Sequence, residues 1–182
     1  MINRKGDWIQ VFSGKKFWPF DPKNEEIDIN DIAHALALQC RFNGHCEEFY
    51  SIAQHSVLVS KIVPKDQALS ALLHDAAEAY IGDMVRPLKK FMEEFKSVEK
   101  KVEKEIFKKF EVAGLNEEIK KADNIALATE MRDLMKRSPE NWDISSFGTL
   151  PEKIIPLNPK EAKEEFLKRF YELIKTRNLL NH

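Results

Sequence analysis

The chain has 182 residues, 43% of them hydrophobic, and its 29 basic and 30 acidic residues leave a formal net charge of −1. This apolar content argues against an intrinsically disordered chain, and the length suits one domain of ordinary size with a buried core. The balanced charge gives no support for a partner as highly charged as a nucleic acid polymer or a membrane surface.

The two cysteines and the N-terminus bear on the compartment. Cys40 and Cys46 are too few for a disulfide framework and match no CxxC zinc motif, so we expect free thiols. The N-terminal residues lack the long apolar core of a signal peptide, and no apolar run reaches the length of a transmembrane helix. We therefore expect a soluble, cytoplasmic protein.

The first thirty residues are rich in aromatic side chains and show no helical periodicity. The stretch "DWIQVFSGKKFWPF" has two apolar segments on either side of Ser13-Gly14, which predicts a short β-hairpin. Pro19 and Pro22 end any regular element that follows, because proline cannot donate a backbone hydrogen bond.

Beyond residue 30 the apolar residues recur at the i, i+3/i+4, i+7 spacing of amphipathic helices. Asp28 or Asn30 is the candidate N-cap of the first helix, and Asn116 that of the fifth. The sequence thus predicts an all-α bundle in one domain, 1–182, with a short N-terminal hairpin. Its six main helices are expected over residues 31–40, 50–63, 65–82, 87–112, 117–135 and 159–180, with a loop over 138–158.

Four ionisable side chains lie where a helical core would hold leucine or isoleucine. His55 is on the apolar stripe of the second predicted helix, His74 and Asp75 interrupt an Ala/Leu run in the third, and Asp123 is on the inward face of the fifth. Burying an unpaired carboxylate is costly, so such groups pair with a cation or bind a metal ion. Two imidazoles and two carboxylates predict a centre for Mn²⁺, Co²⁺, Fe²⁺, Zn²⁺ or Ni²⁺ rather than Ca²⁺.

Further acids follow these candidate ligands at helical spacings. Glu78 lies four residues after His74, on the same face of the predicted helix, and could exchange a proton with water or a leaving oxygen. Asp83 follows at the expected mouth of the site. Glu130, seven residues after Asp123, is a candidate neighbour of the ligands. The stretch is not the HExxH motif of zinc proteases, because an aspartate follows the first histidine.

The order of the candidate ligands, H…HD…D, matches the signature of the HD-domain metal-dependent phosphohydrolases. The segments "AQHSVLVS" and "ALLHDAAEAYIGDMVRPLKK" resemble the small single-domain branch, which includes bacterial 5′-deoxynucleotidases and a phage deoxyadenosine-triphosphate triphosphohydrolase. The resemblance covers about residues 30–135, and "CRFNGH" at 40–45 looks like the segment before the first ligand. It implies an all-helical fold and one divalent ion per subunit (Co²⁺, Mn²⁺, Zn²⁺, Fe²⁺, Ni²⁺ or Mg²⁺) held by His55, His74, Asp75 and Asp123.

The same resemblance assigns roles to residues around the ion. It implies that Glu78 acts as general acid/base and that Asp83 orients the water or the leaving group. Arg41 would bind the substrate phosphate with its planar fork of donors. His45 and Arg86 are the other candidate substrate contacts.

The expected activity is hydrolysis of the 5′ phosphoester of (deoxy)nucleotides. A 5′-nucleotidase would release inorganic phosphate from a monophosphate, whereas a triphosphohydrolase would release whole triphosphate from a dNTP. The segment "CRFNGH" slightly favours the triphosphohydrolase. The partner is therefore a small-molecule nucleotide, and a homo-oligomer, either a dimer or a hexamer, is consistent with the resemblance.

Two other functions stay open. One is hydrolysis of another phosphoester, such as a cyclic dinucleotide or (p)ppGpp. HD proteins with two metal ions need further histidines between the HD pair and the last aspartate, and residues 76–122 contain none. The other is a non-catalytic, metal-stabilised HD scaffold. Degenerate HD domains usually lose a ligand or the acid, whereas this sequence has all four candidate ligands and Glu78.

Overall fold

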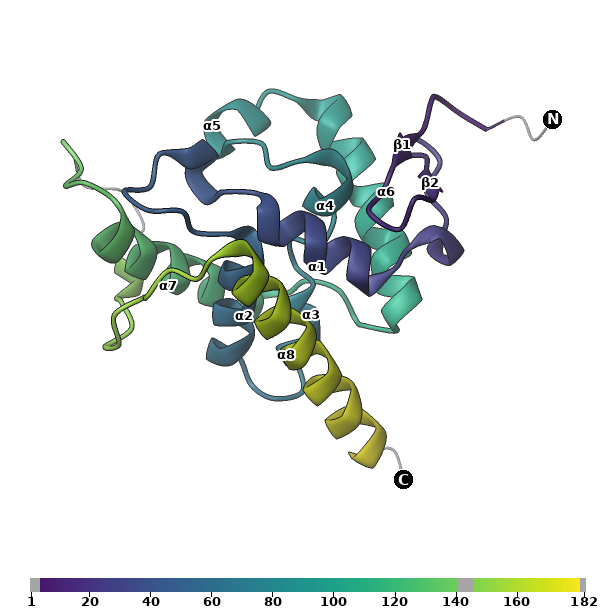
Figure 1. Ribbon diagram of the computed structural model, residues 1–182. Helices are drawn as coiled ribbons and strands as arrows, with labels where there is room; N and C mark the ends of the chain where they lie inside the picture. Colours follow the sequence, from purple (N-terminus) through teal and green to yellow (C-terminus); the bar gives the residue numbers. More distant parts are fainter. Residues whose placement is uncertain (1–3, 141–145, 181–182) are drawn as a thin grey trace.

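The computed structural model describes residues 4–140 and 146–180, and within these ranges its regular secondary structure is almost entirely helical (Figure 1). The strands β1 (Ile9–Gln10) and β2 (Lys16–Phe17) form a short antiparallel hairpin. The all-α fold with an N-terminal hairpin is thus confirmed. The helices are α1 (Ile29–Leu38), α2 (Ile52–Ile62), α3 (Ala68–Leu72), α4 (Glu78–Ile81), α5 (Arg86–Lys89), α6 (Glu93–Phe110), α7 (Glu117–Leu134) and α8 (Pro159–Leu180), with 3₁₀ turns η1 (Asn24–Glu26) and η2 (Arg41–Gly44).

Side-chain caps mark the start of α1, α2 and α7. Asp28, rather than Asn30, caps α1, because its carboxylate accepts a hydrogen bond from the Asn30 backbone N–H. Ser51 caps α2 and Asn116 caps α7 by the same kind of bond. Each cap satisfies a backbone donor that has no partner inside the helix, and so fixes where the helix starts.

Helix α8 packs across α1, α2 and α3, as Figure 1 shows. Its buried side chains recur about every turn and join the main hydrophobic core; they are Ala162, Phe166, Phe170 and Leu173. A smaller apolar cluster joins α2, α3 and α7 through Val59, Ala71, Ile119, Ala122 and Ala126. This cluster holds together the two helices that carry His55 and Asp123 and the helix just before the turn that carries His74 and Asp75. In the described part of the chain no helix has the length and apolar content to span a lipid bilayer.

The third predicted helix, over 65–82, is wrong as one continuous element. The structure has two short helices, α3 and α4, separated by turns over residues 73–77. In these turns the Ala76 N–H binds the carbonyl of Leu73 and the Glu78 N–H that of Asp75, so i→i−3 bonds replace the α-helical pattern. His74 and Asp75 therefore lie in a tightened turn and not in a helix.

The fourth predicted helix, over 87–112, is also divided, into α5 and α6. Its expected apolar stripe is only partly buried. Val102 and Ile106 lie in the core, whereas Leu88 and Phe91 are 50% and 84% exposed. The segment before α6 contributes little to the core, so no burial of apolar side chains favours a continuous helix from Pro87.

Candidate metal centre and active site

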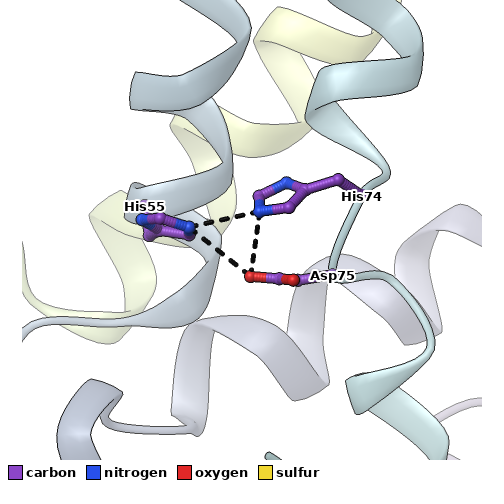
Figure 2. A group of neighbouring side chains, drawn as sticks. All are labelled: His55, His74 and Asp75. Carbon is purple, nitrogen blue, oxygen red and sulfur yellow. Dashed lines mark hydrogen bonds and ion pairs between the residues drawn. The ribbon is translucent and has the colours of Figure 1, made fainter. Parts of the chain in front are cut away.

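The four candidate ligands converge although they come from three separate parts of the chain. His55 lies on α2, His74 and Asp75 on the turn between α3 and α4, and Asp123 on α7. Figure 2 shows the first three side chains pointing at one another. The Nε2 atoms of the two histidines are 3.2 Å apart, and Asp75 Oδ2 lies 3.5 Å from that of His55 and 3.1 Å from that of His74.

Asp123 reaches the same point from α7. Its Oδ1 lies 3.2 Å from His55 Nε2 and 4.0 Å from His74 Nε2, while its Oδ2 accepts a bond from Arg86. Bonds of 2.0–2.2 Å from one ion to nitrogen and oxygen donors place neighbouring donors about 3.0–3.6 Å apart. All of these separations except the 4.0 Å between Asp123 and His74 lie in that range. His55, His74 and Asp75 therefore fit one divalent ion in both chemistry and spacing, with Asp123 Oδ1 beside them.

Both histidines are oriented by a bond to the ring nitrogen that faces away from this point. His74 Nδ1 donates to the carbonyl oxygen of Ala71 over 2.8 Å, and His55 Nδ1 donates to the Glu130 carboxylate over 2.6 Å. Since both acceptors lack a proton to give, each Nδ1 carries the hydrogen and each Nε2 faces the other ligands. Partners of this kind fix a ligand's tautomer and ring orientation.

The charges of the site are strongly coupled. Burial and Arg41 lower the pKa of His55, but Glu130 and Asp123 outweigh them and raise it to about 9. Burial opposes ionisation of Asp75 and Asp123, yet the neighbouring histidines hold the pKa of each carboxyl well below its usual range. The two aspartates are therefore ionised and able to neutralise a cation.

Glu78 is the first residue of α4. It lines the same cavity as His74 and Asp75, and this cavity has a volume of about 740 Å³. It is only 8% exposed, and its Oε2 has no hydrogen-bond partner among the described residues. Burial, then the negative charges of Asp75 and Asp83, raise the pKa of Glu78 well above its ordinary value. A carboxyl group that holds its proton near neutral pH can act as a proton donor.

Arg41 enters the cavity from the first residue of η2. Its Nη2 lies 3.1 Å from Glu130 Oε2, its Nη1 lies 3.6 Å from Asp75 Oδ2, and its buried Nε has no partner in the described ranges. The next residues, Phe42 and Asn43, have φ angles of 56° and 50°, a left-handed conformation that side chains disfavour. This local strain turns the chain sharply just after the arginine, a feature common at functional sites.

The remaining predicted site residues also line this cavity. His45 is exposed at the end of η2, and Asp83 follows Gly82, whose φ of 78° ends α4. Arg86 is exposed and binds Asp123 Oδ2 over 2.7 Å. All nine predicted residues thus lie at the cavity or, for His55, beside the ligands that line it.

Sequence reasoning missed the part of the cavity wall that α6 provides. The mixed lysine and glutamate run over 93–110 fits a solvated face. In the structure, however, Glu99 is buried and pairs with Lys89, and both line the cavity with Glu103. Burial, then the charge of Glu99, raises the pKa of Glu103 to about 7. The i, i+4 spacing of these two glutamates could have suggested a shared face, but the sequence did not show which way that face points.

Fold and site together define a helical protein of the HD type with one candidate metal centre. Comparison with known sequences places the chain in a particular family: residues 31–138 match the family model described as 5′-deoxynucleotidase YfbR-like, and the chain belongs to this family. The resemblance to small HD phosphohydrolases is thereby confirmed, and the family makes the protein a hydrolase of the nucleotide phosphohydrolase class.

Two relatives extend this comparison. The chain is 40% identical to the uncharacterized protein YfdR of Escherichia coli over 173 residues, which cover 93% of this chain and 97% of YfdR. It is 39% identical to an uncharacterized protein of Rhodobacter capsulatus over 94 residues, which cover 47% of this chain and 48% of that protein. The YfdR match covers nearly the whole chain, so the similarity extends beyond the metal ligands.

Proposed function

We propose that the protein is a metal-dependent phosphohydrolase that cleaves the 5′ phosphoester of deoxynucleotides. The observation that carries the proposal is the meeting of His55, His74, Asp75 and Asp123 at one point of a cavity that also holds an acid and an arginine. The family description, a 5′-deoxynucleotidase, names the same chemistry.

These four residues would hold one divalent ion. When bound, such an ion supplies Lewis acidity toward the phosphoryl group and makes water a stronger acid. The chain itself prepares the site: the bonds that the two histidines donate to Glu130 and to the Ala71 carbonyl hold both Nε2 atoms toward the ion, and the two aspartates supply negative charge. Mixed imidazole and carboxylate donors suit Mn²⁺, Co²⁺, Fe²⁺, Zn²⁺ or Ni²⁺, with Mg²⁺ as a further candidate.

Glu78 would move the proton. In its neutral form, the carboxyl carries a proton that it can give to the leaving 5′ oxygen of the nucleoside; once ionised, it can take a proton from water. Its burial and its acidic neighbours favour the neutral form at rest. Asp83, on the same wall of the cavity, would orient the water or the leaving group.

Arg41 would bind the phosphate. It lines the cavity and its guanidinium is fixed by Glu130, so it presents donors at little further cost in entropy. His45 and Arg86 would add contacts at the mouth, where both are exposed. Phe42, which lines the same wall, would contact the nucleoside.

The number of phosphates in the substrate distinguishes two versions of this activity. The family description supports a monophosphate. A triphosphate is the second candidate, because Lys89 and Lys120 extend the cationic lining beyond Arg41 and Arg86. These lysines are paired with Glu99 and Glu117, so a longer phosphate chain would have to compete with those pairs.

A product-resolving assay tests the proposal. The protein would be stripped of metal, supplied with Mn²⁺, Co²⁺ or Mg²⁺, and given each dNMP, NMP, dNTP and NTP before chromatography. Nucleoside plus phosphate from dNMPs establishes the nucleotidase, and nucleoside plus intact triphosphate establishes the second candidate. Metal binding without turnover of any nucleotide would contradict the proposal and favour another phosphoester or a non-catalytic scaffold.

The organisation of the chain is part of the proposal as well. We propose one domain over 1–182 that assembles into a homo-oligomer, a dimer or a hexamer. The exposed apolar side chains of Val85, Leu88 and Phe91, around α5, support such an assembly because a monomer would leave them in water. Light scattering coupled to size-exclusion chromatography measures the mass directly, and a monomer at all concentrations would contradict this part.

A further inference from the structure

We propose that Glu130 is a positioning residue that couples metal binding to phosphate binding. Its side chain contacts one candidate metal ligand, His55, and the candidate phosphate-binding residue, Arg41. The inference rests on the proposed function for the role of Arg41, while its metal half stands on geometry alone. Nothing in the family description assigns a task to this carboxylate.

The geometry divides the carboxylate between two partners. Oε1 accepts the His55 Nδ1–H bond over 2.6 Å, and Oε2 accepts a bond from Arg41 Nη2 over 3.1 Å. Glu130 and His55 are both fully buried, and Arg41 is nearly so. Neither bond can be replaced by solvent, so the orientation of the imidazole and that of the guanidinium depend on the same side chain.

The negative charge of Glu130 holds Arg41 and His55 and so limits how strongly Arg41 interacts with Asp75. Each of the two Glu130 carboxylate oxygens accepts a bond from one of these groups, so Glu130 is the acid that both contact. Arg41 Nη1 is already 3.6 Å from Asp75 Oδ2. Without the Glu130 charge, Asp75 becomes the nearest remaining acid for Arg41, and the arginine then competes with a metal ion for that ligand.

Two consequences follow for the intact protein. A carboxylate that accepts the outer N–H of a ligating histidine raises the basicity of its metal-binding nitrogen and fixes its direction. The same carboxylate aims Arg41 into the cavity. A change at Glu130 therefore alters metal affinity and substrate affinity together, and these effects are linked through Arg41.

The test compares wild type, Glu130→Gln, Arg41→Ala and the double variant of the full-length protein. Metal affinity is measured on metal-stripped protein by titration with Mn²⁺ or Co²⁺, and KM and kcat are measured with the best substrate. Glu130→Gln is expected to weaken metal binding about 10- to 100-fold and to raise KM. In the double variant, loss of Arg41 frees Asp75, so metal affinity should recover in part and KM should rise no further than in Arg41→Ala.

Asp31→Asn is the matched control. Asp31 is also buried and binds the Ser13 backbone N–H and hydroxyl, but it lies on α1 and lines a different cavity from the one that holds the ligands. It should lower the denaturation midpoint without changing metal affinity. If Glu130→Gln does not fold, Glu130→Asp, which keeps the charge but is too short to contact both partners, serves in its place.

Unchanged metal affinity in the Glu130 variants, or a loss no larger than in Asp31→Asn, would overturn the inference. So would additive effects in the double variant, because they would mean that Arg41 and His55 respond independently. If the wild-type protein turns over no nucleotide but Glu130→Gln still weakens metal binding as expected, the proposed function is overturned. The metal half of this inference then stays in place.

Discussion

The two histidines of the metal centre are held in different ways. His74 is anchored by a backbone carbonyl three residues earlier, at Ala71, whereas His55 is anchored by a side chain 75 residues later, at Glu130. The first anchor forms whenever the local turn forms. The second forms only when α2 and α7 are packed together, so it also responds to every group that Glu130 contacts. The bond to Ala71 therefore makes the orientation of His74 insensitive to changes elsewhere in the fold. The bond to Glu130 makes the orientation of His55 depend on the other groups that Glu130 contacts.

The largest expected effect comes from removing the ligand that both histidines face. Asp75→Asn keeps the shape of the side chain but removes a charge within 3.5 Å of both Nε2 atoms. Without that charge we expect the ion to be lost even though both histidines keep their bonds to Ala71 and Glu130. Turnover should then fall by more than about a thousandfold.

Thermal unfolding with and without metal checks this independently of activity. Mn²⁺ should raise the Tm of the wild-type protein, because a ligand that binds only the folded state stabilises it, and should leave the Tm of Asp75→Asn unchanged. Full activity in the Asp75 variant would sink the assignment of the centre.

The next effect separates chemistry from metal binding. Glu78 touches neither anchor, and its Oε2 is free of partners within the described residues. Glu78→Ala should therefore retain the ion while kcat falls about 10²- to 10⁴-fold, the usual contribution of a general acid or base. Equilibrium dialysis followed by metal analysis decides the point: if the variant loses its ion, Glu78 is a ligand and its proposed role is wrong.

A smaller effect is expected at the outer oxygen of Asp123. Arg86 binds Oδ2 of this ligand from an exposed position, while Oδ1 faces the histidines. Because exposed ion pairs contribute roughly 0–1 kcal/mol, Arg86→Ala should weaken metal binding less than about fivefold. We expect KM to rise and kcat to change little, with a smaller difference from wild type at high salt. A collapse of kcat would show that Arg86 acts on the reacting atoms.

The difference between the two anchors also explains what the sequence could predict. Periodicity identified the helices that carry His55 and Asp123, and the cap residue Asn116 also marked the start of the second of these helices, because both signals act over one or two turns. The break over residues 73–77 was not predicted. The Ala/Leu run there is compatible with a helix, and the turn that brings His74 and Asp75 onto one side is recognised only from its i→i−3 bonds.

The pairing of Arg41 with Glu130 was beyond sequence reasoning for a related reason. Spacing placed Glu130 on the inward face of its helix, and family resemblance pointed to Arg41, but the two lie 89 residues apart. Only the tertiary fold brings these two side chains together. The buried position of Glu99 in a run of alternating charges was missed on the same ground, since the run fits a solvated face equally well.

The smallest functional effect is expected at the local anchor. Ala71 binds His74 through its backbone carbonyl, which no side-chain substitution removes, and its buried methyl group packs in the cluster that joins α2, α3 and α7. Ala71→Gly should lower the free energy of unfolding by about 1–2 kcal/mol, through lost helix propensity and a small cavity. Metal affinity should stay within about twofold of wild type, in contrast to the Glu130 variants. Urea unfolding and metal titration on the same samples measure both quantities. If metal affinity falls as far as in Glu130→Gln, the Ala71 carbonyl depends on the rigidity of α3, and the two anchors do not differ in kind.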